Sequence, residues 1–396
     1  MVRGAARPLL GLGLAGACIT AAPAPAQVAY LGEDIGQQAK MLEGAPAEPD
    51  ATGTDAGTKK KNDLIVAPIP VSNPALGTGA AVAAVLYYNP NHAPNPWVTG
   101  VAGGYTSTDT WGVGIVHQMS LAKDHVRINA LAGYGDAKLK FYGVGDLADS
   151  GISVDLRDKG FLASIDAQTK LFDRGLLSHL YIGARASYIR VRSSVSIPTP
   201  NRPDLNLPSI ELRSQVSAIG PAFTFDTRDD PQNPRRGVYA TGNMMFGADF
   251  LGSDFEHRKL EIATNGFFAL GKGTVLGIRK TLCGVKGKAP FYDLCLFGKQ
   301  NDLRGYEPGR YRDGASWALQ AEVRQHIVGK LGAVAFGGVG GIADSTDDIW
   351  KHSHVLASGG VGLRYLASRS NNVNLRFDVA WGKDGTAFYF GIGEAF

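Results

Sequence analysis

The sequence lacks any uninterrupted apolar run of the roughly 18–20 residues that a membrane-spanning helix requires. The stretch Ala80–Leu86 is among its longest apolar segments, so a helical membrane protein is excluded. Basic residues are scattered rather than clustered, and the formal net charge is only +4. The sequence therefore gives no indication of nucleic-acid binding.

Familiar catalytic signatures are also missing. The chain contains no G-x-S-x-G, no H-E-x-x-H and no phosphate-binding glycine loop that ends in Lys-Ser or Lys-Thr. His352 and His354 lie near Asp347 and Asp348 in the sequence, as metal ligands would, but we interpret them as solvated loop ends. We expect no enzymatic activity, no cofactor and no metal site.

The N-terminus has the composition of a targeting segment. Arg3 and Arg7 precede an apolar stretch over residues 8–22, and Ala24-Pro25-Ala26 has the A-x-A form of a cleavage site. This pattern predicts a secretory signal peptide over residues 1–26.

Cysteine is scarce, with three in the whole chain. Cys18 would leave with the signal peptide, although the weak lipidation box formed by residues 15–17 leaves a lipoprotein as the alternative. Cys283 and Cys295 would then remain in the mature chain. A close pair in an exported protein can oxidise, so we consider a disulfide here and, as the alternative, two reduced thiols.

The remaining chain divides at residue 62. Residues 27–61 are rich in Gly, Ala, Asp, Thr and Lys, which predicts a flexible periplasmic segment too short for an independent domain. From residue 62 to 396 apolar residues recur with period two. In the stretch SWALQAEVRQHI (316–327), one face carries Trp317, Leu319, Ala321 and Val323, and the other carries Gln320, Glu322, Arg324 and His326.

These strands fit either a soluble sandwich or a transmembrane barrel. Two observations favour the barrel: arginine and aspartate share the polar faces, as in a wet interior, and the connections alternate between short and long. We therefore predict an all-β fold over residues 62–396, a transmembrane antiparallel β-barrel of about 16 strands. The long connections, at 135–159, 193–212 and 285–315, are expected outside the cell.

The end of the sequence adds a localisation signal. Phe388, Phe390, Ile392 and Phe396 would share one face of a last strand over residues 386–396. A membrane-facing aromatic strand at this position resembles the recognition signal of outer-membrane proteins. We therefore expect the barrel to lie in the bacterial outer membrane, in contact with its lipid.

Four stretches together resemble the barrel of the bacterial surface antigen family, which includes the Bam and Tam assembly factors and the two-partner secretion transporters. LRGY (Leu303, Arg304, Gly305, Tyr306) resembles the family's Val-Arg-Gly-Phe/Tyr loop tetrad. FDTRDDPQNPRRG (225–237) resembles its D-x-R-D…P-x-x-G turn. VNLRFDVAWG and FYFGIGEAF resemble its last two strands.

The resemblance implies that the long extracellular loop at 285–315 folds back into the lumen and places Arg304 against the inner wall. Glu322, on the next strand, is the expected lumenal partner, because a guanidinium can fix a loop to a wall carboxylate. The family's F-x-D-x-G aspartate is absent, since Gly338 falls at its position. We therefore expect a less tightly held loop, with Asp378 or Arg376 rearranging the network and a Cys283–Cys295 disulfide compensating in part.

Two further motifs carry expectations. Asp226, Arg228, Asp229, Pro234 and Gly237 are expected to form a structural periplasmic turn, with partner docking as the alternative.

Pro68 and Pro70, two residues apart, remove backbone donors from one edge of the first strand. We predict a short, easily parted seam between residues 64–71 and residues 388–396, which end at Phe396. In the alternative interpretation, the prolines only face the second strand.

Three functions then compete: an assembly or translocation factor, a passive channel or structural barrel, and, most remotely, an enzyme. We predict the first from the resemblance, with unfolded outer-membrane proteins as candidate partners. The assembly factors of the family carry periplasmic POTRA repeats, which residues 27–61 cannot accommodate. A separate periplasmic partner would then have to supply client binding.

Overall fold

The computed structural model describes residues 63–73, 77–91, 97–151, 153–196, 210–298, 302–368 and 372–396. The predicted signal peptide and flexible segment lie outside these residues. Helical structure in the described part is confined to four 3-10 turns, η1 (Ala122–Asp124), η2 (Gly145–Ser150), η3 (Leu176–His179) and η4 (Asp249–Leu251). No helix among the described residues is long and apolar enough to cross a membrane.

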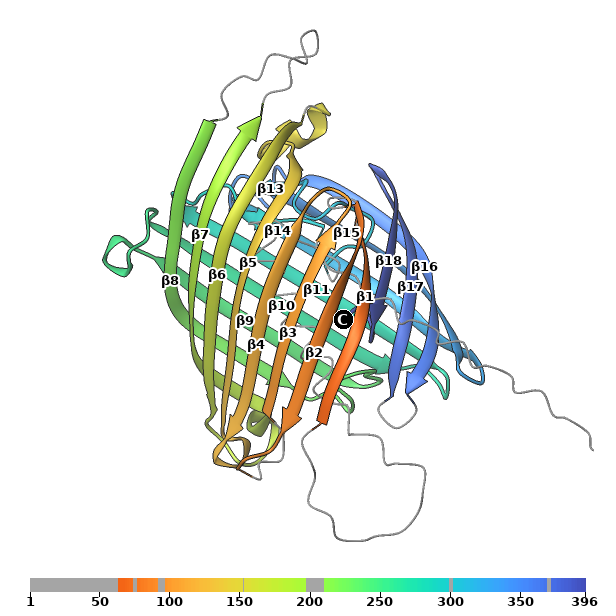
Figure 1. Ribbon diagram of the computed structural model, residues 1–396. Coiled ribbons are helices and arrows are strands. Elements are labelled where there is room, and N and C mark those ends of the chain that lie inside the picture. Colours follow the sequence, from red (N-terminus) through yellow and green to blue (C-terminus); the bar gives the residue numbers. More distant parts are fainter. Residues whose placement is uncertain are drawn as a thin grey trace, which may run out of the picture.

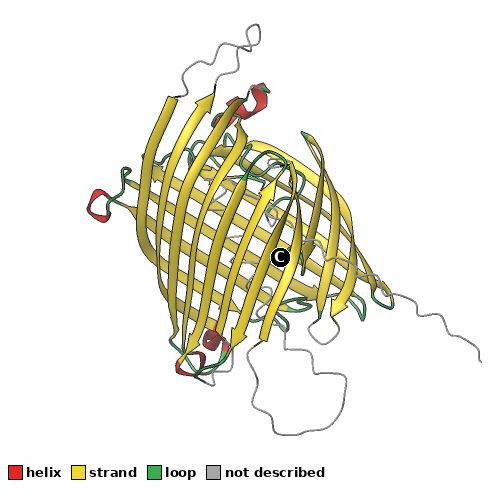
Figure 2. Ribbon diagram, viewed as in Figure 1, coloured by secondary structure: helices red, strands yellow, loops and turns green. Residues whose placement is uncertain are grey.

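Sixteen antiparallel strands form one sheet in chain order, in which β11 pairs with β14 across the loop that contains β12 and β13, and the sheet curls into a barrel (Figures 1 and 2). The predicted all-β barrel of about 16 strands is therefore confirmed. The strands are β1 (Asp63–Asn73), β2 (Gly77–Tyr88), β3 (Trp97–Thr106), β4 (Trp111–Leu121), β5 (Val126–Phe141), β6 (Val154–Lys170), β7 (Leu180–Ser196), β8 (Ile210–Asp226), β9 (Gly237–Gly247), β10 (His257–Ala269), β11 (Thr274–Gly287), β14 (Ala315–Val328), β15 (Leu331–Ala343), β16 (His354–Ser368), β17 (Val373–Gly382) and β18 (Gly385–Ile392). A separate two-stranded hairpin, β12 (Cys295–Leu296) with β13 (Arg312–Asp313), lies in the loop between β11 and β14.

The period-two pattern sorts side chains between lipid and lumen as predicted. On β14, Leu319 and Val323 are 39% and 41% exposed, whereas Glu322 is 1% exposed. On β17, Trp381 is exposed and Asp378 is fully buried. Apolar side chains therefore cover the outer surface and ionic ones line the interior, the arrangement of a transmembrane barrel.

Strands β5 to β8 are longer than predicted. About half of the expected loop 135–159 is strand, because β5 continues to Phe141 and β6 begins at Val154, and both ends of the expected loop 193–212 are strand, because β7 continues to Ser196 and β8 begins at Ile210. In the outer portion of β5, charged residues (Asp136, Lys138, Lys140) still alternate with apolar ones (Ala137, Leu139, Phe141), and the backbone ladder continues. In Figure 1 the four strands rise beyond the rest of the wall.

The two edge strands, β1 and β18, lie next to each other. Within the described residues no backbone ladder joins them, whereas every other neighbouring pair in the sheet is laddered. The β1–β2 ladder runs unbroken through Pro68 and Pro70, opposite Val82 and Ala80.

The direction in which Pro68 and Pro70 face follows from a comparison with β8. There, the β8–β9 ladder skips Gly220 and Pro221 and resumes at Ala222. Since a proline that faces a neighbour interrupts the ladder, the unbroken β1–β2 ladder indicates that the backbone nitrogens of Pro68 and Pro70 face β18.

The prediction for Phe396 was wrong. Strand β18 ends at Ile392, and Gly393 adopts a left-handed conformation with φ +79°. The chain then turns into the lumen, where Phe396 is 6% exposed and its ring lies 6.4 Å from that of Phe267. A glycine that reverses the backbone breaks period two, so the alternation cannot be extended to Phe396.

Candidate functional site

The loop between β11 and β14 folds into the barrel and forms the centre of the candidate site. Arg304, Leu303 and Tyr311 are fully buried, and Tyr306 is 1% exposed. A chain segment that connects two strands at a barrel rim would normally lie in water. The burial of a complete Leu-Arg-Gly-Tyr tetrad therefore requires specific partners on the wall.

Arg304 is held by two carboxylates on different strands. Its Nη2 donates to Glu322 Oε2 on β14 at 2.5 Å, and its Nη1 donates to Asp378 Oδ2 on β17 at 2.6 Å. Its backbone N–H and Nε both donate to Gln320 Oε1 at 3.2 Å. The guanidinium carbon lies 3.5 Å from the ring centroid of Phe336 on β15, a cation–π contact.

The two carboxylates belong to a larger buried network. Glu322 Oε1 also accepts from Arg324 Nε at 2.6 Å, and Asp378 Oδ1 accepts from Arg364 Nη1 at 2.6 Å. Arg364, on β16, in turn donates from Nε to Oε2 of Glu394 at 2.7 Å. Glu394 lies two residues after the end of β18. A buried charge is tolerated only when it is paired and hydrogen-bonded. This network therefore couples the loop to β14, β16, β17 and the segment after β18.

Gly305 and Tyr306 complete the attachment. Gly305 has φ +114°, and its N–H donates to Tyr389 Oη on β18 at 2.8 Å. A Cβ at this position would lie 3.0 Å from the Cβ of Ser358, so glycine is needed for both conformation and space. Tyr306 Oη donates to the Ala357 carbonyl at 2.6 Å, and its ring packs edge-on against Phe297 with centroids 5.5 Å apart.

Two carboxylates hold Arg304 although the family's F-x-D-x-G aspartate is absent. Asp378, one of the two residues expected to rearrange the network, supplies the second carboxylate from β17, and the position of the missing aspartate is used for packing. A Cβ on Gly338 would lie 2.6 Å from Leu303 Cδ1 and 2.9 Å from the Gln320 Cα. The glycine thus makes room for the buried leucine of the tetrad, and the expected partner residue could not fit beside it.

We expect Gly338→Asp to destabilise the loop instead of restoring a family contact. The added side chain would overpack against Leu303 and the β14 backbone, at a cost of about 1–3 kcal/mol. The matched control is Gly337→Ala, where the nearest atom to a new Cβ is the Ser358 carbonyl oxygen at 3.6 Å. The check is the thermal midpoint of the heat-induced mobility shift in gels; a midpoint for Gly338→Asp at or above that of the control would contradict this packing.

The base of the loop is attached separately. Cys283 on β11 and Cys295 on β12 are joined by a disulfide, with Cα atoms 5.7 Å apart. Asp293 Oδ2 lies 2.7 Å from His257 Nε2, and Asp293 Oδ1 accepts from Lys259 Nζ at 3.0 Å. These contacts to β10 and β11 restrict the part of the loop that precedes the tetrad.

Two charged residues follow the tetrad. Burial raises the pKa of the Glu307 carboxyl above its usual value. Burial also lowers the pKa of the Arg312 guanidinium to about 10, so Arg312 remains charged at neutral pH. The Arg312 Nε donates to the Gly309 carbonyl at 2.9 Å and closes a tight turn at the end of the loop.

The periplasmic turn between β8 and β9 has the internal bonds expected from its motif. Asp226 Oδ2 accepts from Arg228 Nη2 at 2.8 Å, and Asp229 Oδ1 accepts the backbone N–H of Arg235 at 2.9 Å. Gly237 has φ +109°, and an added Cβ would lie 2.7 Å from the Arg228 Cα. Pro234 is buried within the turn.

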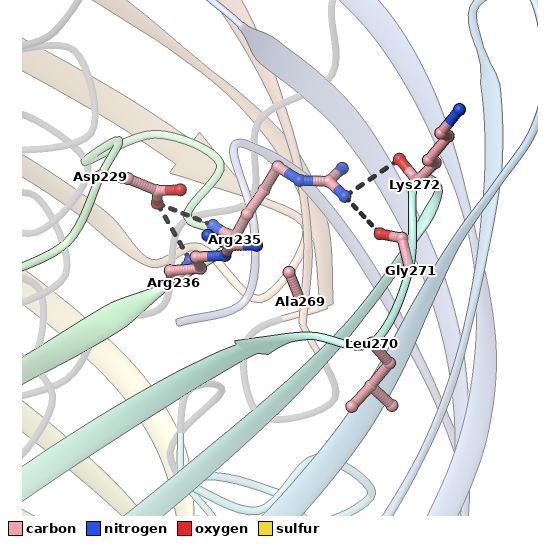
Figure 3. A pocket seen from close by; sticks show the side chains of 7 residues that line it. All are labelled: Asp229, Arg235, Arg236, Ala269, Leu270, Gly271 and Lys272. Atoms are coloured by element: carbon pink, nitrogen blue, oxygen red, sulfur yellow. Dashed lines mark hydrogen bonds between the residues drawn. The ribbon is translucent and has the colours of Figure 1, made fainter.

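The same turn also reaches two other turns. Arg235 Nη2 donates to the carbonyls of Gly271 and Lys272 at 2.9 and 3.0 Å, across a shallow pocket between the β8–β9 and β10–β11 turns (Figure 3). Asp230 Oδ2 accepts from Asn372 Nδ2 at 2.8 Å. Asn372 immediately precedes β17, six places after β9 in the sheet order. The turn therefore crosses part of the periplasmic opening, which sequence reasoning did not anticipate.

The structure thus brings the tetrad, Glu322 and Asp378 together, and it places the turn motif and the prolines elsewhere on the barrel. Phe336 beneath Arg304 was not predicted, although it belongs to the Phe-Gly-Gly run in which Gly338 stands in place of the family's aspartate. Period two along β15 was the available signal, because it places Phe336 inward and its neighbour Ala335 outward.

Comparison with known proteins identifies the family. A model of the Omp85 superfamily domain matches residues 125–396, more than half of the chain. No curated protein matches by sequence.

Solved structures share the fold at low identity. BamA from Haemophilus ducreyi, in a form lacking POTRA domains 1–3, has a TM-score of 0.56 at 12% identity, over 92% of this chain and 77% of that one. CdiB from Escherichia coli has a TM-score of 0.57 at 13% identity, over 85% of this chain and 63% of that one. CdiB from Acinetobacter baumannii has a TM-score of 0.52 at 13% identity, over 84% and 59%. The chain therefore spans less than two thirds of the length of either CdiB. The chain belongs to the Omp85 superfamily, and its barrel lies in the bacterial outer membrane.

Proposed function

We propose that the protein inserts or translocates other proteins at the outer membrane, and that it is neither an enzyme nor a passive pore. The observation that carries the proposal is the contrast between a wall in which a ladder joins every neighbouring pair of strands and its two edges, β1 and β18, which no ladder joins within the described residues. An unpaired strand edge presents free backbone donors and acceptors to an incoming strand. A client strand could therefore pair with β1 or β18 at the place where the barrel opens into lipid.

The interior supports this proposal over a passive channel. The loop packs Phe297, Leu303, Tyr306 and Tyr311 into one buried cluster inside the barrel. Glu394 and Phe396, which follow β18, are also buried inside the barrel. A wide diffusion pore requires an open aqueous bore, whereas this bore is occupied at the level of the tetrad.

Client handling is the remaining requirement. We propose that a separate periplasmic protein delivers unfolded outer-membrane proteins to the barrel. The periplasmic turns around Asp229, Arg235 and Lys272 are the surface on which we would look for that protein.

The test is depletion of the protein, followed by quantitative proteomics of the outer membrane. We expect several other barrels to decrease while lipoproteins and periplasmic proteins stay constant. Complementation then compares the wild-type chain with variants that carry one new cysteine in β1 and one in β18, so that oxidation staples the seam. A staple between Ala335 and Val361, which are paired across β15 and β16, serves as the control.

The proposal predicts that the seam staple abolishes complementation until it is reduced, and that the control staple does not. Planar-bilayer recording of the purified protein separates the alternative. Large, steady open channels, together with an unchanged outer-membrane proteome after depletion, would identify a pore and refute the insertase proposal.

A further inference from the structure

The connection between β6 and β7, at the periplasmic end of the barrel, exposes four large apolar side chains. Leu171, Phe172, Leu176 and Leu177 are 56%, 46%, 69% and 48% exposed. We call these four residues the apolar turn. Connections that lie in water are usually built from Gly, Pro, Asn, Asp and Ser. A group of exposed apolar side chains marks a contact with another surface.

Local hydrogen bonds hold the apolar turn in shape. Gly175 has φ +72°, and the 3-10 turn η3 follows it directly. The Gly175 carbonyl accepts from the Ser178 N–H at 3.1 Å and from the Ser178 hydroxyl at 2.7 Å. The N–H of Leu180 donates to the Leu177 carbonyl and closes the turn. An ordered backbone therefore keeps Leu176 and Leu177 on the surface.

The apolar turn continues the lipid-facing surface of the wall. Ile165 on β6 and Ile182 on β7 point outward and are 48% and 38% exposed, whereas Tyr181 points inward and is 4% exposed. Leu171 directly follows the last residue of β6 and lies an even number of residues beyond Ile165. Because alternate residues of a strand share a face, Leu171 extends the outward row. The connection thus leaves the wall on its lipid side and rejoins it there.

Two exposed cations accompany the apolar turn. Arg174 lies in the same connection, and Lys123 lies at the tip of the neighbouring β4–β5 turn. The two connections are joined, since His125 Nε2 lies 2.6 Å from Asp173 Oδ1 and the Lys170 N–H donates to the His125 carbonyl at 2.8 Å. Within the described residues, no hydrogen bond or ion pair engages the side chain of Lys123 or Arg174.

The acidic residues around these cations already have partners. Asp124 is 8% exposed and accepts from Arg127 Nη2 at 2.6 Å, and Asp226 at the end of β8 accepts from Arg228 Nη2 at 2.8 Å. The other acidic residues of the β6–β7 and β8–β9 connections are also bonded: Asp173 to His125, Asp229 to the backbone N–H of Arg235, and Asp230 to Asn372. The β2–β3 connection, residues 89–96, contains no acidic residue. Lys123 and Arg174 therefore remain available to an anionic ligand.

We infer that the apolar turn inserts into the periplasmic leaflet of the outer membrane, and that Lys123 and Arg174 bind the headgroup phosphate of an anionic phospholipid there. Leucine and phenylalanine side chains enter the boundary between acyl chains and headgroups, and lysine and arginine beside them are attracted to anionic headgroups. A periplasmic protein would have to reach a surface that is continuous with the lipid-facing wall, which is why we commit to lipid. The contact anchors the wall near the middle of the strand order, away from the seam.

The first experiment places one environment-sensitive fluorescent label on the full mature chain in vesicles of phosphatidylcholine and phosphatidylglycerol, with brominated lipid as the quencher. Leu177→Cys carries the label in the test protein. Arg236→Cys carries it in the control, because Arg236 is exposed in the β8–β9 turn, where residues 227–236 include no large apolar side chain. The native Cys283 and Cys295 do not compete for the label, since a disulfide joins them. We expect quenching at position 177 and none at position 236.

The second experiment measures phosphatidylglycerol retained in detergent by native mass spectrometry. Each cation removed from an anionic lipid surface should lower retention about 5-fold, so Lys123→Gln with Arg174→Gln should lower it about 25-fold. Arg236→Gln, which removes an exposed arginine from a turn without the apolar group, should leave retention unchanged.

Equal quenching at positions 177 and 236, or unchanged retention by the folded double variant, would each overturn the inference. A label at position 177 that is shielded only after a periplasmic extract is added would assign the surface to a protein, and would overturn it as well. The heat-induced mobility shift in gels reports whether each variant folds. If Leu177→Cys does not fold, Phe172→Cys carries the label instead, and it must be quenched for the inference to stand.

Discussion

Replacing Arg304 by alanine will detach the lumenal loop from the barrel wall. Glu322 and Asp378 would each lose a partner inside the barrel, where breaking a buried ion pair costs about 3–5 kcal/mol. Because Arg324 and Arg364 still contact these carboxylates, we expect a loss near the lower end, at about 3 kcal/mol. The measurement is the free energy of unfolding in detergent, together with protease sensitivity of the loop from the extracellular side.

Arg310→Ala is the matched control for this substitution. Arg310 lies in the same loop and pairs with Asp384 at 3.0 Å, but both side chains are partly exposed. A single pair that keeps some contact with solvent contributes less than two fully buried ones, so this variant should lose clearly less stability than Arg304→Ala. Arg304→Lys keeps the charge without the planar fork and should fall between the two. Equal losses for Arg304→Ala and Arg310→Ala would show that the buried pairs do not hold the loop.

Amide exchange will show the seam as the weakest part of the barrel wall. We expect amides of β1 and β18 to exchange at least about 100-fold faster than those of β15 and β16, an opening free energy lower by about 2.8 kcal/mol. Two features cause this: no ladder joins β1 to β18 within the described residues, and Pro68 and Pro70 offer no N–H on the edge that faces β18.

Substitution of the two prolines tests the cause of that difference. Pro68→Val with Pro70→Val returns two donors to this edge, so protection of β18 should rise towards that of the wall. Pro221→Val is the control, because Pro221 lies at the interruption of the β8–β9 ladder, well away from the seam. If the amides of β1 and β18 in the wild-type chain exchange as slowly as those of β15, the seam is not weak and the prediction is refuted.

The sequence allowed the strands and one ion pair of the site to be predicted, for a physical reason. Period two reports which face of a strand meets lipid, so Glu322 could be placed in the lumen next to the loop that follows β11. Asp378 could only be offered as one of two candidates. Its distance from Arg304 depends on how the barrel closes, and no local pattern encodes that closure.

Other features depend on contacts between distant segments or on a local break in the pattern. The outer ends of β5 and β6 pair as strands, and the alternation of charged and apolar residues over 136–141 was an available signal that the predicted loop bounds did not use. A single left-handed residue, Gly393, turns Phe396 inward. The bond between Asp230 and Asn372 joins residues 142 positions apart, and each side chain alone has the appearance of an ordinary turn residue.

That last bond has a consequence for the function we propose. The β8–β9 turn acts as a tether beneath the bore, anchored to the β10–β11 turn by Arg235 and to the residue before β17 by Asp230. A client polypeptide arriving from the periplasm would have to break this tether to travel along the barrel axis. Pairing with the edges of β1 or β18 requires no such rupture, so in the proposed function the architecture favours insertion into the bilayer over passage through the bore.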